Sequence, residues 1–112
     1  MNTIRYNVFP GGCHHCITMS YDDGNLADVR LTQIFRENGI AGTFHLNAGK
    51  LDQPGRVSAA DIPEIYAGQE VSCHTFTQPF PTELPDAGVL AEITEDRRTL
   101  ERASGTIVRG MS

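Results

Sequence analysis

Short apolar runs alternate with longer amphipathic stretches along this chain of 112 residues. The short runs have the length of strands and lie at 17–21, 42–46, 70–73 and 106–109. Stretches in which apolar residues recur with helical spacing lie between them, at 26–38, from 58 to about 66, and at 86–103. The order βαβαβαβ predicts an α/β fold in which parallel strands are joined by helices.

Glycine and proline mark the ends of the predicted helices. Gly39, Gly68 and Gly105 each follow a helical stretch, where glycine supplies the left-handed cap that other residues avoid. Pro63 lies inside the second stretch, and its ring removes a backbone hydrogen bond there. The sequence therefore predicts an irregular second helix.

Four short parallel strands leave both edges of an open sheet exposed, whereas a closed barrel has no edges. We therefore expect the chain to form the first half of a larger barrel. The expected division is a lead-in segment at 1–16 and the barrel part at 17–112.

Polar residues follow the predicted strands at or just past their carboxyl ends: Asp22, Asp23, Asn47, His74 and Arg109. Parallel α/β sheets and barrels bind their ligands at this end of the strands. The convergence of several strand ends on one rim predicts a functional site. The alternative interpretation is that these positions are polar because loops are generally polar.

Asp22 and Asp23 are adjacent, and Gly24 after them permits a turn that brings both carboxylates toward one site. Two close carboxylates repel, so either one is protonated or a cation lies between them. A metal ion would divide the roles, with one carboxylate as ligand and the other as base. The alternative is an Asp-Asp-Gly turn that begins a helix.

Three segments, 17–24, 42–46 and 68–79, together resemble the polysaccharide deacetylases, the NodB-like family 4 carbohydrate esterases. The first family motif ends in Asp-Asp-Gly, as this sequence does at 22–24. The second is His-(Ser/Thr)-x-x-His, and this sequence has His74 to Thr77 followed by Gln78. The third begins with an arginine at a strand end, which Arg109 matches, although the aromatic and proline residues that follow in the family are missing.

The resemblance implies an irregular (β/α) barrel and a hydrolase that releases acetate from N- or O-acetylated sugars. Asp22 would be the base that activates water, and Arg109 would hold Asp22 charged and oriented. Asp23 and His74 would bind a divalent metal, with zinc the expected ion. The expected partner is an acetylated sugar or polysaccharide.

Two departures from the family pattern affect this expectation. Gln78 stands at the position of the second histidine ligand, and a neutral carboxamide oxygen suits hard cations better than zinc. The sequence thus predicts weak zinc binding or a different metal, unless His45 supplies a replacement imidazole. The later family motifs are also missing. The chain is then an incomplete enzyme, inactive as it stands, or a catalytically degenerate carbohydrate-binding or structural member.

Cys13, His14, His15 and Cys16 form a second conspicuous cluster. A C-x-x-C pair can give two thiolates to a structural zinc, which needs four ligands, and no second such pair is present. A small zinc-binding interaction module is thus a third hypothesis. The simpler interpretation is a solvated segment with reduced thiols, since three cysteines make a poor disulfide framework.

Composition limits the binding partners and the cellular location that can be expected. The net charge is −5 with no basic block, which argues against nucleic acid and anionic membranes. No apolar stretch approaches the roughly 20 residues of a membrane span. The first residues lack the apolar core of a signal peptide, so the expected location is the cytoplasm, unless the true N-terminus lies elsewhere. The sequence does not predict an oligomeric state.

Overall fold

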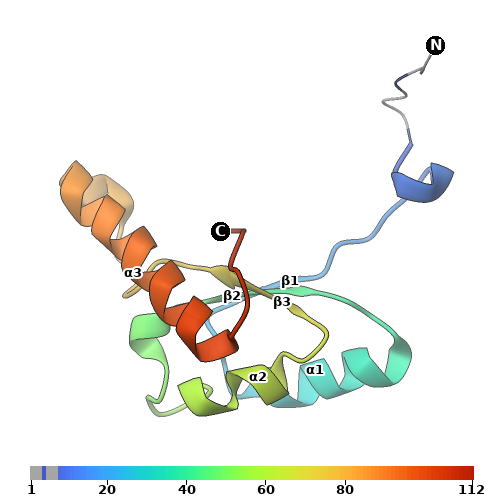
Figure 1. The fold of residues 1–112 in the computed structure, drawn as a ribbon, viewed down its shortest axis with the longest axis horizontal. Coiled ribbons are helices and arrows are strands. Elements are labelled where there is room, and N and C mark those ends of the chain that lie inside the picture. The colour runs from blue at the N-terminus through green and yellow to red at the C-terminus, as the bar shows by residue number, and fades with distance from the viewer. Residues whose placement is uncertain (1–3, 5–7) are drawn as a thin grey trace.

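The computed structural model describes residues 4 and 8–112. Its centre is a three-stranded parallel sheet in the order β1-β2-β3 (Figure 1). The strands are β1 at Ser20–Asp22, β2 at Thr43–Leu46 and β3 at Glu70–Cys73. This confirms the expected α/β class with parallel strands, which corresponds to part of a (β/α) barrel.

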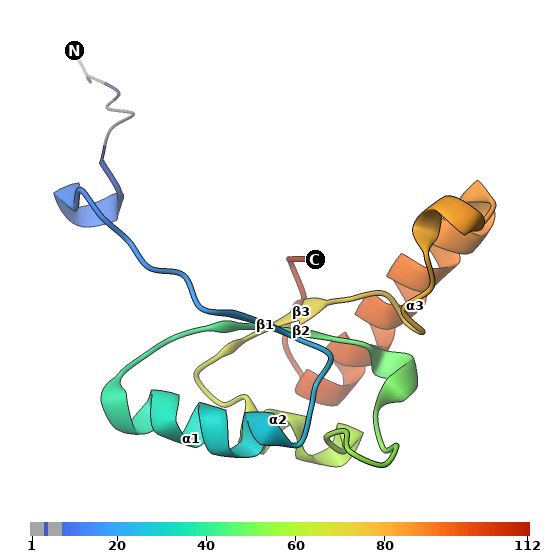
Figure 2. The ribbon, with the colours of Figure 1, turned by 180° about the vertical axis from the view of Figure 1, so that it is seen from behind.

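Three α-helices connect and follow the strands: α1 at Ala27–Asn38, α2 at Ile62–Ile65 and α3 at Asp86–Ser104. Figures 1 and 2 show α1 and α2 side by side on one side of the sheet. Short 3₁₀ turns complete the described part, at Pro10–Gly12, Ala48–Lys50 (η2), Ala59–Asp61 and Pro81–Glu83. No described helix is long and apolar enough to cross a membrane.

Glycine ends α1 and α3 as expected, whereas α2 ends earlier, with Tyr66 as its C-cap and Gly68 two residues further on. Gly39 and Gly105 adopt the left-handed conformation, with φ of 64° and 69°, directly after α1 and α3. The helix that contains Pro63 is indeed irregular, because it is a single α-turn preceded by a 3₁₀ turn.

The strand register sorts side chains onto two faces of the sheet. Phe44 pairs with Tyr21 and Val71, while its neighbour His45 pairs with Asp22 and Ser72. The apolar face, turned toward the helices, packs its rings closely, with 5.5 Å between the Tyr21 and Phe44 centroids. The fully buried apolar side chains are Phe44, Leu46, Val57, Ile62, Leu100 and Val108. The opposite face carries polar residues, among them Asp22, His45 and Ser72.

The first and last predicted strands differ from the expectation. Pairing of the first begins only at Ser20, and Ile17 is 89% exposed. The predicted strand at 106–109 is not formed. Glu101 of α3 accepts a hydrogen bond from the Val108 amide, so this stretch stays against the end of α3 with Val108 buried. Contact with β3 comes later, as a parallel bridge between Cys73 and Met111.

A buried polar pair joins α1 to the end of α2. The Tyr66 hydroxyl donates to a carboxylate oxygen of Asp28 at 2.7 Å, and both residues are at most 5% exposed. Burial raises the pKa of Asp28, although the bond from Tyr66 and the charge of Arg56 lower it. Burial and the Asp28 charge also raise the pKa of Tyr66, so its hydroxyl stays a donor at all moderate pH values.

The raised pKa of Asp28 predicts a pH dependence of stability. The folded protein keeps the Asp28 proton at a pH where the unfolded chain has lost it, so stability is lost as pH rises from about 3.8 through the folded pKa. Asp28→Asn keeps an acceptor for Tyr66 without the charge. We expect a larger free energy of unfolding than wild type at neutral pH, and less loss of stability on going from acidic to neutral pH, measured by urea denaturation.

Asp28→Ala is the matched control, because it removes the acceptor and leaves the Tyr66 hydroxyl unpaired. Such a loss costs about 1–3 kcal/mol. An Asp28→Asn protein less stable than wild type at neutral pH would contradict the interpretation.

Candidate functional site

The carboxyl ends of the strands bring Asp23 and His74 together. Backbone pairing continues one residue past each outer strand. The Asp23 amide donates to the carbonyl of His45 at 2.8 Å, and the His74 amide donates to the carbonyl of Leu46 at 3.0 Å. Because both bonds end on β2, the middle strand sets the separation of the two residues.

The side chains of Asp23 and His74 face each other. His74 Nε2 lies 3.7 Å from Asp23 Oδ1, and the side chains are 17% and 29% exposed respectively. The other ring nitrogen, Nδ1, lies 2.8 Å from the carbonyl oxygen of Ser112. A carbonyl can only accept, so Nδ1 carries a proton and, in the neutral ring, Nε2 presents its lone pair to Asp23.

Arg56 is a member of this site that the sequence analysis missed. Its guanidinium lies 3.5 Å from Asp23 Oδ2 and also donates to the Asp23 backbone carbonyl at 2.6 Å. An antiparallel bridge between Asn25 and Arg56 brings this loop residue next to the end of β1. No motif or spacing in the sequence indicates this contact.

Gln78 also reaches the site, but with its amide nitrogen toward the carboxylate. Gln78 Nε2 donates to Asp23 Oδ1 at 2.9 Å. The amide oxygen points the other way and accepts from the Lys50 ammonium, which follows β2 in η2. Lys50 thus holds the amide in the orientation that offers Asp23 a donor. The sequence analysis did not single out Lys50.

A divalent ion would find two suitable protein ligands here, Asp23 and His74, and an unsuitable third, Gln78. A catalytic zinc takes three protein ligands, and Asp23 Oδ1 and His74 Nε2 are a carboxylate oxygen and an imidazole nitrogen that face one another. Gln78, as oriented, offers no lone pair there. Across residue 4 and residues 8–112, no three His, Cys, Asp or Glu side chains are grouped closely enough to hold an ion.

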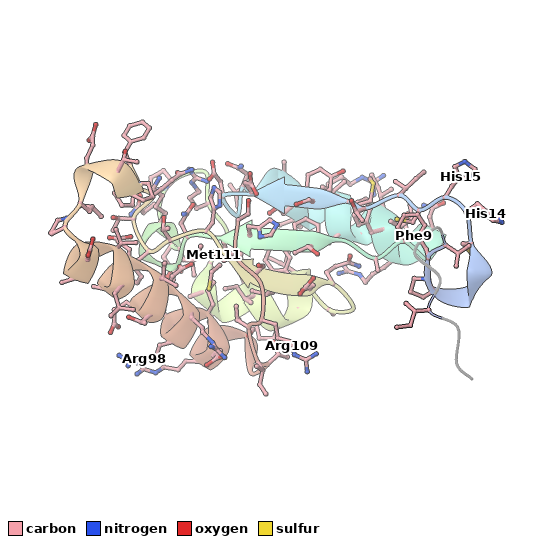
Figure 3. All side chains as sticks on the ribbon, turned by 90° about the horizontal axis from the view of Figure 1, so that it is seen from above. Phe9, His14, His15, Arg98, Arg109 and Met111 are labelled. Atoms are coloured by element: carbon pink, nitrogen blue, oxygen red, sulfur yellow. The ribbon has the colours of Figure 1, made fainter. Side chains whose placement is uncertain are left out.

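The side chains of the other predicted site residues, Asp22, Arg109 and His45, take no part in the contact between Asp23 and His74. Asp22 has an exposed side chain. Arg109 is also exposed and points outward in Figure 3, and the ion pairs of the described residues do not include it. His45 Nε2 is 2.9 Å from the Ser20 hydroxyl, and its ring centroid is 6.3 Å from that of His74. The structure therefore does not bring Arg109 to Asp22.

The Cys13–Cys16 cluster is remote from the site. Both cysteines are exposed free thiols. Figure 3 shows their neighbours His14 and His15 at one end of the molecule, whereas Met111 lies near its middle. In the described part of the chain this cluster gathers no set of three metal-ligating side chains.

The site lies within a match to a known family. Residues 11–112 match the family model for polysaccharide deacetylase. This stretch covers most of the sequence, so the chain belongs to the polysaccharide deacetylase family, as its motifs indicated. A comparison with curated proteins gave no match.

Solved structures of this family share the fold. The Streptococcus pyogenes deacetylase PplD in complex with acetate gives a TM-score of 0.83 at 13% identity, over 95% of this chain and 48% of that chain. A family 4 carbohydrate esterase from Streptomyces lividans, also in complex with acetate, gives 0.67 at 25% identity, over 85% and 48%.

A third similar structure is a mutant of BA3943, a CE4 family pseudoenzyme with restored enzymatic activity. Its TM-score is 0.68 at 24% identity, over 84% of this chain and 34% of that chain. The present chain thus spans between about a third and a half of the length of these structures.

The orientation of Gln78 leads to a prediction for Lys50. Lys50→Met removes both a positive charge and the donor that holds the Gln78 oxygen away from Asp23. We expect divalent ions to bind roughly three- to tenfold more tightly, because a partly exposed charged contact is worth about 1 kcal/mol. Isothermal titration with Zn²⁺ and Mn²⁺ measures this change.

Lys50→Arg is the matched control, since it keeps the charge and a donor, and its affinity should stay near that of wild type. Equal affinities for Lys50→Met and wild type would show that Lys50 does not govern the orientation of Gln78.

Proposed function

We propose that this chain carries the N-terminal part of the active site of a metal-dependent polysaccharide deacetylase, which removes acetyl groups from N- or O-acetylated sugars. Family membership supports the reaction class. The observation that carries the proposal is the pairing of Asp23 with His74, whose Nε2 faces the carboxylate at 3.7 Å while Nδ1 is held by a backbone carbonyl.

In this proposal Asp23 and His74 hold the divalent ion, with zinc the expected one. When bound, the ion would polarise the acetyl carbonyl and make water a better nucleophile. Asp22, adjacent to the ligand and exposed to solvent, would take the proton of that water. We retain Arg109 as the proposed partner of Asp22, to be contacted in the complete domain, while Arg56 neutralises Asp23.

The protein that performs the reaction is expected to include more than these residues. The chain covers about a third to a half of the similar structures, and the later family motifs, including the histidine that protonates the leaving amine, are not among its residues. We therefore propose deacetylation for a domain completed by further sequence, with 17–112 as its first part.

A second candidate function is favoured by Gln78. A carboxamide that donates to Asp23 and is fixed by Lys50 offers a donor where an ion needs a ligand. On this proposal the chain is a degenerate member that retains the fold to bind carbohydrate without hydrolysis. Such members have a precedent in the CE4 pseudoenzyme with a similar fold.

Gln78→His tests the two candidates, because an imidazole at this position completes the family's ligand set. We expect zinc affinity to rise by roughly tenfold or more, as for a catalytic site that gains its third protein ligand. Zinc titration measures the affinity, and acetate release from chitooligosaccharides measures activity, on this chain and on any longer chain that contains it.

The double variant Gln78→His with Asp23→Asn is the control, and it should lose the gained affinity. Activity in the longer wild-type chain supports the deacetylase proposal. Activity only with Gln78→His supports the degenerate member. Zinc affinity that does not respond to either substitution would contradict a metal centre at Asp23 and His74.

A further inference from the structure

Asp96, near the middle of α3, is fully buried and caps the ends of two strands. Its Oδ1 accepts from the Ala48 amide at 2.7 Å. Its Oδ2 accepts at 2.9 Å from the His74 amide, which also donates to the Leu46 carbonyl at 3.0 Å, so this amide is shared between two acceptors. Burial, and after it the Asp96 charge, raise the pKa of the neighbouring Cys73 thiol to about 12, so this thiol stays protonated.

The opposite side of the same backbone is held by Asn47, which is also fully buried. Its side-chain nitrogen donates to the carbonyls of His74 and Thr75. Thr75 adopts a positive φ of 63°, a conformation that β-branched residues disfavour. The amide and the carbonyl of His74 are thus each fixed by a buried polar side chain, one from α3 and one from the end of β2.

Burying these polar groups lowers the free energy of unfolding. A buried carboxylate loses several kcal/mol of hydration, which hydrogen bonds only partly restore. Ordinary packing of α3 would need only apolar residues, such as its buried Leu100. Asp96, Asn47 and the strained turn at Thr75 instead surround one residue, His74. Strain of this kind gathers at functional sites.

We propose that Asp96 is a positioning residue for His74. By holding the His74 amide against Ala48, the carboxylate sets the direction in which the imidazole leaves β3, toward Asp23. The inference deepens the proposed function and rests on it, because it assigns a purpose to His74. A buried acidic side chain on α3, late in the chain, then organises a site formed by residues at the ends of β1 and β3.

The test compares Asp96→Asn with Leu100→Ala in the protein. Asparagine keeps the shape of the side chain but has one acceptor oxygen for two amide donors. Leu100→Ala destabilises the same helix by removing an apolar core side chain that makes no hydrogen bond to the His74 backbone. Thermal unfolding gives the stability of each, and all measurements are made where both variants are folded. If Asp96→Asn fails to fold, Asp96→Glu replaces it, because it keeps the charge and displaces it.

Two measurements report on His74 directly. The first needs no metal: NMR of the imidazole, whose Nδ1 proton is bound to the Ser112 carbonyl, and hydrogen exchange of the His74 amide. The second is zinc titration of the Gln78→His background. For Asp96→Asn we expect loss of the bound imidazole signal, amide exchange roughly tenfold faster or more, and zinc affinity roughly 10- to 100-fold weaker. Leu100→Ala should leave all three near wild type.

Unchanged His74 signals and exchange in the Asp96 variant overturn the proposal. So does an equal change in Leu100→Ala, because the effect would then follow stability alone. If no variant binds zinc, the metal centre of the proposed function fails, while the NMR readout still decides the role of Asp96.

Discussion

The site depends on the central strand, β2, because both of its outer neighbours end on it. The carbonyls of His45 and Leu46 accept from the amides of Asp23 and His74, so two residues 51 positions apart in sequence are fixed by two backbone bonds. Parallel pairing spaces neighbouring strands by about 4.8 Å. Residues that extend the ladder on either side of β2 are therefore close enough for long side chains to meet across it.

Charge balance at this edge follows from that proximity. Asp23 brings one carboxylate near a histidine, and the fold surrounds it with Arg56 directly and with Lys50 through Gln78. A carboxylate in this position needs compensation, whether by a metal or by side chains. In the present arrangement side chains supply it, and the amide of Gln78 gives its donor to the carboxylate.

Periodicity and glycine positions were sufficient to predict α1, α3, β2 and β3, because these elements bury one regular face. The same signals wrongly predicted a strand at 106–109. There the Val108 amide donates to the Glu101 side chain, and pairing with β3 begins only at Met111. Asp23 and His74 could be predicted from strand ends and motif spacing. Arg56, Lys50 and Asp96 could not, because each reaches the site through tertiary contacts that leave no local pattern. The role of Arg109 stays a prediction, because pairing with β3 begins only after it, at the bridge between Cys73 and Met111.

Whether this site holds an ion depends more on the number of protein ligands than on the hydrogen bonds that Asp23 already accepts. The bonds to Asp23 from Arg56 and Gln78 involve partly exposed groups, and each such contact is worth about 1 kcal/mol or less. A complete zinc site supplies roughly 10–16 kcal/mol in structural cases. An ion with three good ligands would therefore easily displace the hydrogen bonds from Arg56 and Gln78, which are each worth only about 1 kcal/mol or less. An ion held by only Asp23 and His74 gains less binding free energy with which to break these hydrogen bonds. The identity of residue 78 therefore controls ion binding more strongly than Arg56 and Lys50 do.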